Sequence, residues 1–135
     1  MYIFDGAMGT MLQAAGLEEG YCPELFNVEK PEVVKNIHAQ YLQHGSDVIT
    51  TNTFGACGLK LEDYDLQDRV REINIAAVKV AKEAIAEVKP SARVAGSMGP
   101  TGRFLQPLGN MSFDSIYDTY REQAEALIEG GVDFI

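Results

Sequence analysis

The sequence has only two cysteines, no long apolar run and no signal-like leader. Cys22 and Cys57 are too few for a disulfide framework, which agrees with a reducing compartment. No apolar stretch approaches the roughly 18–20 residues that a membrane span needs. The first residues also lack the charged and then apolar layout of a signal peptide. We therefore expect a soluble, cytoplasmic protein that does not associate with membranes.

Basic residues are also scarce. Lys and Arg total 11 against 20 acidic residues, which gives a formal charge of −9. A strongly acidic domain repels phosphate backbones, so we expect no nucleic-acid partner. The acidic residues form no long block, and their spread over helix faces serves solubility.

The 135 residues, with 46% hydrophobic content, are enough for one globular domain with a core. Apolar residues recur with a period of 3.6 in three stretches, which predicts helices over 65–88, 31–45 and 112–131. Asp65 and Ser112 are the expected N-caps, Pro31 suits a first turn, and Pro90 bars continuation. Gly45 and the glycines at 130–131 are expected to end the other two helices. A short helix over Gly9–Ala15 is expected after the opening segment.

Short apolar runs rich in β-forming residues lie between these helices. Continuous rather than alternating apolarity indicates strands buried on both faces, as in a parallel sheet. The order β-α-β-α-β-α-β predicts an α/β fold, either doubly wound or a (β/α)8 barrel. The four expected strands are Tyr2–Phe4, Asp47–Thr51, Arg93–Ser97 and Val132–Ile135.

The chain length bears on the choice between these folds. A complete barrel needs about 250 residues, and this chain stops inside the expected fourth strand. Four strands alone would leave exposed sheet edges, which invite self-association. We therefore expect residues 1–135 to be the N-terminal part of a barrel domain, ending in its fourth strand.

Long glycine-rich loops follow the first three expected strands, and the helix-to-strand junctions are brief. In parallel α/β folds, ligands bind at the carboxyl ends of the strands. In the first loop, DGAMGT, Asp5 offers a carboxylate to an ammonium, and the backbone N–H groups over 6–10 offer a seat for a carboxylate. A carboxylate next to free N–H groups suits a free amino acid, which carries both an ammonium and a carboxylate. The alternative is that Asp5 caps the following helix while the glycines ease the turn.

The second and third loops are polar but less specific. Asn52 and Thr53, in TTNTF, could bind a polar ligand or only cap the next loop. The glycine spacing in GSMGPTG does not match a dinucleotide fingerprint, and DGAMGT lacks the Lys-Ser/Thr of a phosphate-binding loop.

We expect no metal site within this chain. Cys22 and Cys57 are far apart, and no C-x-x-C occurs. His38 and His44 are six residues apart on one helix and so point in different directions.

Several stretches in this order resemble the homocysteine S-methyltransferase family. They are DGAMGTMLQ, PELFNVEKPEVVKNIHAQYLQHGSDVITTNTFG, KLEDYDL, EINIAAVKVAKEA, GSMGPTGRFLQPLG and YREQAEALIEGGVDFI. Together they cover nearly the whole chain. DGAMGT, where betaine- and S-methylmethionine-using relatives typically carry D-G-G, favours the homocysteine-binding domain of the cobalamin-dependent members.

The resemblance implies a (β/α)8 barrel that transfers a methyl group to the sulfur of homocysteine, giving methionine. It places Asp5 on the homocysteine ammonium and the backbone of Gly6, Ala7 and Met8 on its carboxylate. Asn52 and Thr53 would line the pocket, with Ser97 and Met98 as weaker candidates for its wall.

The resemblance also implies cofactors held outside these residues. The family's zinc is bound by three cysteines, one after a later strand and two in a G-G-C-C motif. Neither motif occurs here, and Cys22 and Cys57 do not match those positions. The methyl group would arrive on cobalamin recharged from methyltetrahydrofolate, both bound by other modules. We therefore expect part of the substrate pocket and no catalytic residue in this chain.

Three alternatives remain open at this point. The methyl donor could be betaine or S-methylmethionine. The chain could be a non-catalytic half-barrel that pairs with a second copy to cover its edges. It could also belong to an unrelated (β/α)8 enzyme acting on pterins or phosphorylated sugars, although the usual phosphate loops of such barrels would lie outside this chain.

Overall fold

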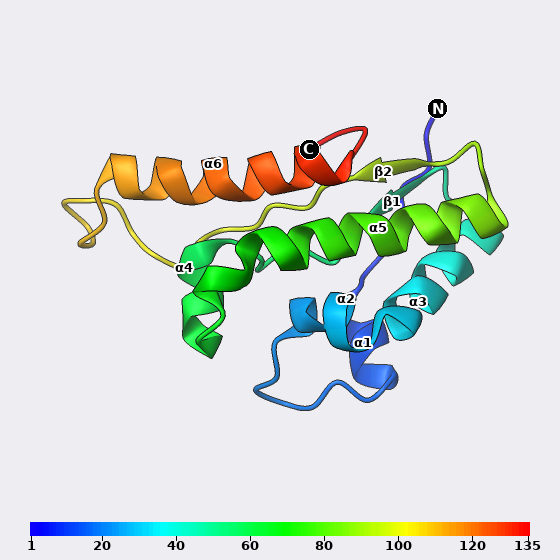
Figure 1. Ribbon diagram of the computed structural model, residues 1–135, viewed down its shortest axis with the longest axis horizontal. Helices are drawn as coiled ribbons and strands as arrows, with labels where there is room; N and C mark the ends of the chain where they lie inside the picture. The colour runs from blue at the N-terminus through cyan, green and yellow to red at the C-terminus, as the bar shows by residue number, and fades with distance from the viewer.

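The computed structural model describes all residues 1–135 as a mixed α/β fold in which helices cover a small parallel sheet (Figure 1). The longest helices, α5 and α6, run side by side, and α3 packs against α5. In chain order the elements are α1 (Gly9–Ala14), η1 (Pro23–Leu25), α2 (Phe26–Glu29), α3 (Pro31–Gln43), β1 (Val48–Thr50), α4 (Gly58–Leu61), η2 (Glu62–Tyr64), η3 (Gln67–Arg69), α5 (Val70–Val88), β2 (Arg93–Ala95) and α6 (Phe113–Gly130).

The sheet consists of β1 and β2, paired in parallel with Val48 opposite Arg93 and Thr50 opposite Ala95. The other two expected strands are not confirmed as strands. Phe4 forms one parallel bridge with Val48, and Phe134 forms one with Ala95. Each of these outer segments therefore pairs with the sheet at a single residue and does not form a ladder. All four segments nevertheless pair in parallel, each with the next one along the chain.

The helix boundaries follow the local signals in most places. Pro31 occupies the first turn of α3, and Gly45, with φ +110°, follows its end. Ser112 caps α6 by accepting a hydrogen bond from the N–H of Ser115 at 3.1 Å. At the other end of α6, Gly131 is left-handed with φ +87°. These are the caps and stops that the sequence predicts.

The predicted start of α5 is wrong. Asp65 does not cap this helix, because it sits in the left-handed region with φ 58° at the end of η2. The chain then makes another short turn, η3, before α5 begins at Val70. The apolar stripe continues from Leu66 into α5, which is why periodicity alone did not reveal the break. The short helices at 23–29 and 58–64 were also not predicted.

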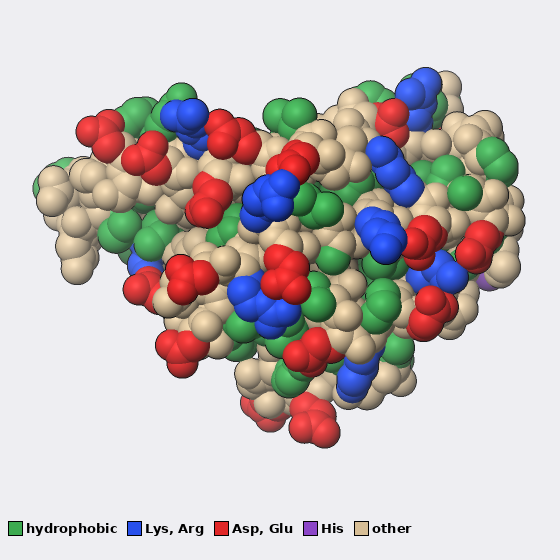
Figure 2. Space-filling view, viewed as in Figure 1, with side chains coloured by type: hydrophobic (Ala, Val, Ile, Leu, Met, Phe, Trp, Pro, Cys, Tyr) green, Lys and Arg blue, Asp and Glu red, His purple; other side chains and the backbone are tan.

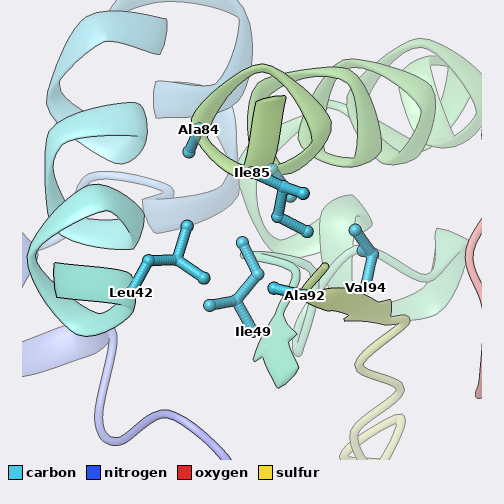
Figure 3. Packing of buried hydrophobic residues seen from close by; sticks show 7 residues of the cluster. Leu42, Ile49, Ala84, Ile85, Ala92 and Val94 are labelled. Atoms are coloured by element: carbon cyan, nitrogen blue, oxygen red, sulfur yellow. The ribbon is translucent and has the colours of Figure 1, made fainter. Parts of the chain in front are cut away.

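The core lies where α3 and α5 cover one face of the sheet. Leu42 of α3 and Ile85 of α5 meet Ile49 of β1 and Val94 of β2 (Figure 3). Burying a side chain of this size stabilises the fold by about 1.5–3 kcal/mol. Neighbouring Val48 and Ile49 point to opposite faces of the sheet, yet both are fully buried. β1 is therefore covered on both sides as expected, whereas Phe4 and Phe134 of the outer segments are exposed.

Charged side chains of both signs are interspersed over the face shown in Figure 2. Several ion pairs join helices, such as Lys35 with Glu87 between α3 and α5 at 3.2 Å. None of the helices combines the length and the apolar character needed to cross a lipid bilayer.

Candidate functional site

A cavity of about 420 Å³ opens where the loops after the first three strand segments meet. These loops are far apart in sequence, but parallel pairing brings the carboxyl ends of β1 and β2 to one edge of the sheet. The position is the one expected for a ligand site in a parallel α/β fold. The cavity is lined by Phe4, Asp5, Gly6, Met8, Gly9, Pro23, Glu24, residues 50–54 and Ser97.

Asp5 does not cap α1. Its carboxylate instead accepts hydrogen bonds from the backbone N–H of Thr50 at 2.8 Å and from the Thr50 hydroxyl at 2.7 Å. Helix α1 has no side-chain cap, so the capping alternative is wrong. Burial raises the pKa of Asp5, and the hydrogen bonds from Thr50 act in the opposite direction. Asp5 is thereby held at the end of β1, facing the cavity.

The backbone after Asp5 is positioned by Tyr41 of α3. The Tyr41 hydroxyl donates a hydrogen bond to the carbonyl of Ala7 at 2.7 Å. Gly6 lies close to the same side chain, since a Cβ at this position would come within 3.0 Å of the hydroxyl. The N–H groups of Gly6, Ala7 and Met8 donate no hydrogen bond within the protein. Gly6 and Met8 line the cavity, whereas Ala7 does not.

Asn52 and Thr53 both reach the cavity, but their side chains are hydrogen bonded within the protein. The Asn52 amide donates to the carbonyl of Pro23 at 2.9 Å. The Thr53 hydroxyl donates to the carbonyl of Ser97 at 2.7 Å. Ser97 in turn donates its N–H to the Thr51 hydroxyl at 3.0 Å. The bonds to Ser97 join the second and third loops, the bond to Pro23 joins the second loop to η1, and together they shape the wall of the cavity. Of the two weaker candidates, Ser97 lines the cavity and Met98 does not.

A buried amide from α6 completes this network. Gln123 is fully buried, and its side-chain NH₂ group donates to the carbonyl of Thr53 at 2.8 Å. The same group also donates to the side-chain oxygen of Asn74 at 3.2 Å. Sequence reasoning placed both residues on helices and assigned them no role. A polar residue within an apolar helical stripe was the available signal.

Glu24 is the lining residue that sequence reasoning missed. Its side chain is 6% exposed, and one carboxylate oxygen accepts the N–H of Gly55 at 2.7 Å. The other oxygen accepts the thiol of Cys22 at 3.4 Å. An acid between Pro23 and the apolar Leu25 was the available signal, because carboxylates are rarely buried without a reason.

The charge of the cavity follows from its lining. Asp5 and Glu24 are carboxylates, and no lysine, arginine or histidine lines the space. Neither acid forms an ion pair with a basic side chain of the protein. The arrangement therefore suits a cationic group beside the acids, with the unused N–H groups at 6–8 available to an anionic one.

The cysteines and histidines do not form a metal site. Cys22 and Cys57 are both free and buried, and Cys22 lies in an apolar cluster with Leu61 and Ile73. Burial raises the pKa of Cys22 to about 12 and raises that of Cys57. His38 is fully buried, whereas His44 is exposed. No group of three or more His, Cys, Asp or Glu residues is placed to hold a metal ion. The residues of this chain thus do not fit a zinc centre.

Comparison with known proteins gives a consistent result. The family model described as homocysteine S-methyltransferase matches residues 2–135. Methionine synthase of Mycobacterium tuberculosis is 40% identical over 141 residues, covering 97% of this chain and 12% of that protein. Methionine synthase of Mycobacterium leprae is 38% identical over the same span.

Solved structures agree with these sequence matches. The homocysteine methyltransferase MmuM from Escherichia coli, in its oxidized form, superposes with a TM-score of 0.80 at 26% identity. The match covers 98% of this chain and 51% of that one. The metallated form of the same enzyme gives a TM-score of 0.79. The chain thus spans about half of the solved relative and a much smaller part of the curated ones.

Proposed function

The chain belongs to the homocysteine S-methyltransferase family, and from this premise we propose that it supplies part of the homocysteine pocket of a methyltransferase. The reaction is the transfer of a methyl group to the sulfur of homocysteine, giving methionine. The observation that carries the proposal is the cavity at the carboxyl ends of the strands, with Asp5 beside three unused N–H groups. The Asp5 carboxylate matches the ammonium of an amino acid, and the unused N–H groups match its carboxylate.

In the proposed complex, Asp5 accepts hydrogen bonds from the homocysteine ammonium. Its carboxylate is held by Thr50 and can use further lone pairs, since an ionised carboxylate has about four acceptor sites. The N–H groups of Gly6, Ala7 and Met8 hold the ligand carboxylate. The wall of the pocket is supported by hydrogen bonds that Asn52, Thr53 and Ser97 make within the protein. In this proposal these residues do not bind the ligand through their side chains.

We also propose that residues 1–135 are the first half of a (β/α)8 barrel, reaching into the fourth strand. Two observations support this. The four β segments pair in parallel and in sequence order, and the chain superposes on 51% of the solved homocysteine methyltransferase. In this proposal, Phe4 and Phe134 mark the positions of the first and fourth strands.

The proposed methyl donor is 5-methyltetrahydrofolate, acting through methylcobalamin, because the curated relatives are methionine synthases. Betaine or S-methylmethionine is the alternative donor. Zinc, cobalamin and folate would be bound by residues and modules outside this chain, and those modules are the proposed partners besides homocysteine. A cytoplasmic location is also part of this proposal, supported by the two unpaired cysteines.

Self-association of a half-barrel is the second candidate. It is favoured by the exposure of Tyr2, Ile3 and Phe4 on one side of the sheet and Phe134 and Ile135 on the other. A monomeric solution mass would count against this second candidate, because self-pairing requires at least a dimer.

The test of the proposed pocket is calorimetric titration of homocysteine into the wild-type chain and Asp5→Asn. Asparagine keeps the shape, and its amide can still bond both groups of Thr50, so the change removes mainly the charge. We expect affinity to fall by about 1–3 kcal/mol, the range for a charge-assisted hydrogen bond.

Asp118→Asn, on the exposed face of α6, is the matched control and should bind like wild type. Equal affinity of the wild-type chain and Asp5→Asn would show that Asp5 only anchors β1. Absence of any binding to the wild type would remove the proposal for this chain.

A further inference from the structure

We propose that Glu24 is a specificity-determining residue of this pocket, whose carboxylate makes the site prefer ligands with a cationic ammonium over otherwise equal ligands without one. The inference rests on the proposed function and deepens it, because it assigns a second acid to the same cavity. Glu24 belongs to η1, an element that contributes neither to the sheet nor to the loops after its strands.

The contacts of Glu24 leave part of its carboxylate available. One oxygen accepts the Gly55 N–H at 2.7 Å, and the other accepts the weaker Cys22 thiol at 3.4 Å. An ionised carboxylate has about four acceptor sites, so these two bonds do not saturate it. The Glu24 side chain also lines the cavity, and no basic side chain lines it.

A buried carboxylate without a cationic partner is costly in free energy. Glu24 is 6% exposed, and its two hydrogen-bond donors are both neutral groups. A ligand ammonium entering the cavity would supply the missing positive charge in a region of low dielectric, where the attraction is stronger than in water. A neutral or anionic ligand would meet two uncompensated acids, Asp5 and Glu24.

The negative charge is not required for holding the loop. The bond to Gly55 needs only an oxygen acceptor, which a glutamine side chain also has. The approach is close, because a Cβ on Gly55 would lie 2.8 Å from the Glu24 oxygen. Loop support and charge can therefore be separated by Glu24→Gln, which keeps the acceptor oxygen and removes the charge.

The experiment compares L-homocysteine with 4-mercaptobutanoate, which has the same thiol and carboxylate but no ammonium. Both are titrated calorimetrically, under reducing conditions, into the full chain and into Glu24→Gln. We expect Glu24→Gln to lose at least tenfold in affinity for homocysteine and to keep or gain affinity for 4-mercaptobutanoate, because the anionic ligand no longer meets the Glu24 charge. Glu19→Gln, an exposed acid nearby in sequence, should behave like wild type with both ligands.

Glu24→Asp provides a second arm if the glutamine variant does not fold. Aspartate keeps the charge but is too short for the bond to Gly55, so both ligands should weaken together and the preference for homocysteine should persist. Loss of the preference for homocysteine in Glu24→Asp would overturn the inference. In Glu24→Gln, an equal loss of affinity for both ligands, or no loss of affinity for homocysteine, would also overturn it. Those results leave the proposed function standing. If the wild-type chain binds neither ligand, the proposed function fails and the inference fails with it.

Discussion

The buried histidine of α3 leads to a prediction about acid stability. His38 is 0% exposed, and neither ring nitrogen has a hydrogen-bond partner. Burial lowers the pKa of His38 from 6.5 to about 4, so the folded protein holds a neutral ring. The unfolded chain takes up the proton near pH 6.5 and the folded one does not. Stability is therefore fully present above pH 6.5 and falls as the pH drops toward 4.

The size of the effect follows from this gap in pKa. At pH 5.5 the unfolded histidine is about ten times more often protonated than neutral, which costs the folded state about 1.4 kcal/mol. Near pH 4 and below, the loss approaches roughly 3 kcal/mol. Measurements at pH 5.5 and 7.5 stay clear of the isoelectric point of about 4.6, where precipitation would interfere.

The assay is urea unfolding followed by circular dichroism at pH 7.5 and 5.5. Carboxylates also titrate as the pH falls, so the informative quantity is the difference in pH dependence between wild type and His38→Leu. We expect the leucine variant to lose about 1.4 kcal/mol less than wild type over this range. His44→Gln, an exposed histidine just after the same helix, should keep the wild-type dependence. Equal losses in wild type and His38→Leu would refute the reasoning.

Two further predictions concern stability and thiol chemistry. Ser112→Ala removes the cap of α6 and should lower the free energy of unfolding, measured by urea titration, by about 1 kcal/mol. The control Ser91→Ala, at an exposed position, should have little effect. Equally small effects of the two substitutions would contradict the role of Ser112 as a cap. Cys22 should react slowly with a disulfide reagent at pH 8 in the native protein and rapidly in urea, because its thiol is buried and its pKa is raised to about 12. Rapid native labelling would contradict the packing of Cys22, and mass spectrometry of the labelled peptide distinguishes it from Cys57.

Local signals were sufficient for much of the fold. The stops at Gly45 and Gly131 and the cap at Ser112 depend on residues within one turn of each helix. Apolar periodicity also predicted the order of α3, β1, α5, β2 and α6, and the resemblance to the homocysteine S-methyltransferase family is confirmed. Asp65 shows the limit of such signals, because a left-handed residue and a short turn interrupt an apolar stripe that reads as continuous.

The outer β segments show a second limit. Tyr2–Phe4 and Val132–Ile135 have the composition of strands, but each forms only one bridge with the sheet. A ladder requires several consecutive residues to pair with the neighbouring strand, and composition does not show how many residues reach that register.

The sequence alone determined that the chain is α/β, that its long polar loops follow the strands and that DGAMGT, TNTFG and GPTG occur in the order typical of the family. Only the tertiary structure decided what the side chains in those loops contact. In the structure, Asp5 is hydrogen bonded to Thr50 and does not cap α1. The side chains of Asn52 and Thr53 are hydrogen bonded within the protein. Glu24, from a separate short helix, lines the cavity. The reason is physical: helix caps and turns are set by neighbours in sequence, whereas a pocket is set by contacts between residues tens of positions apart.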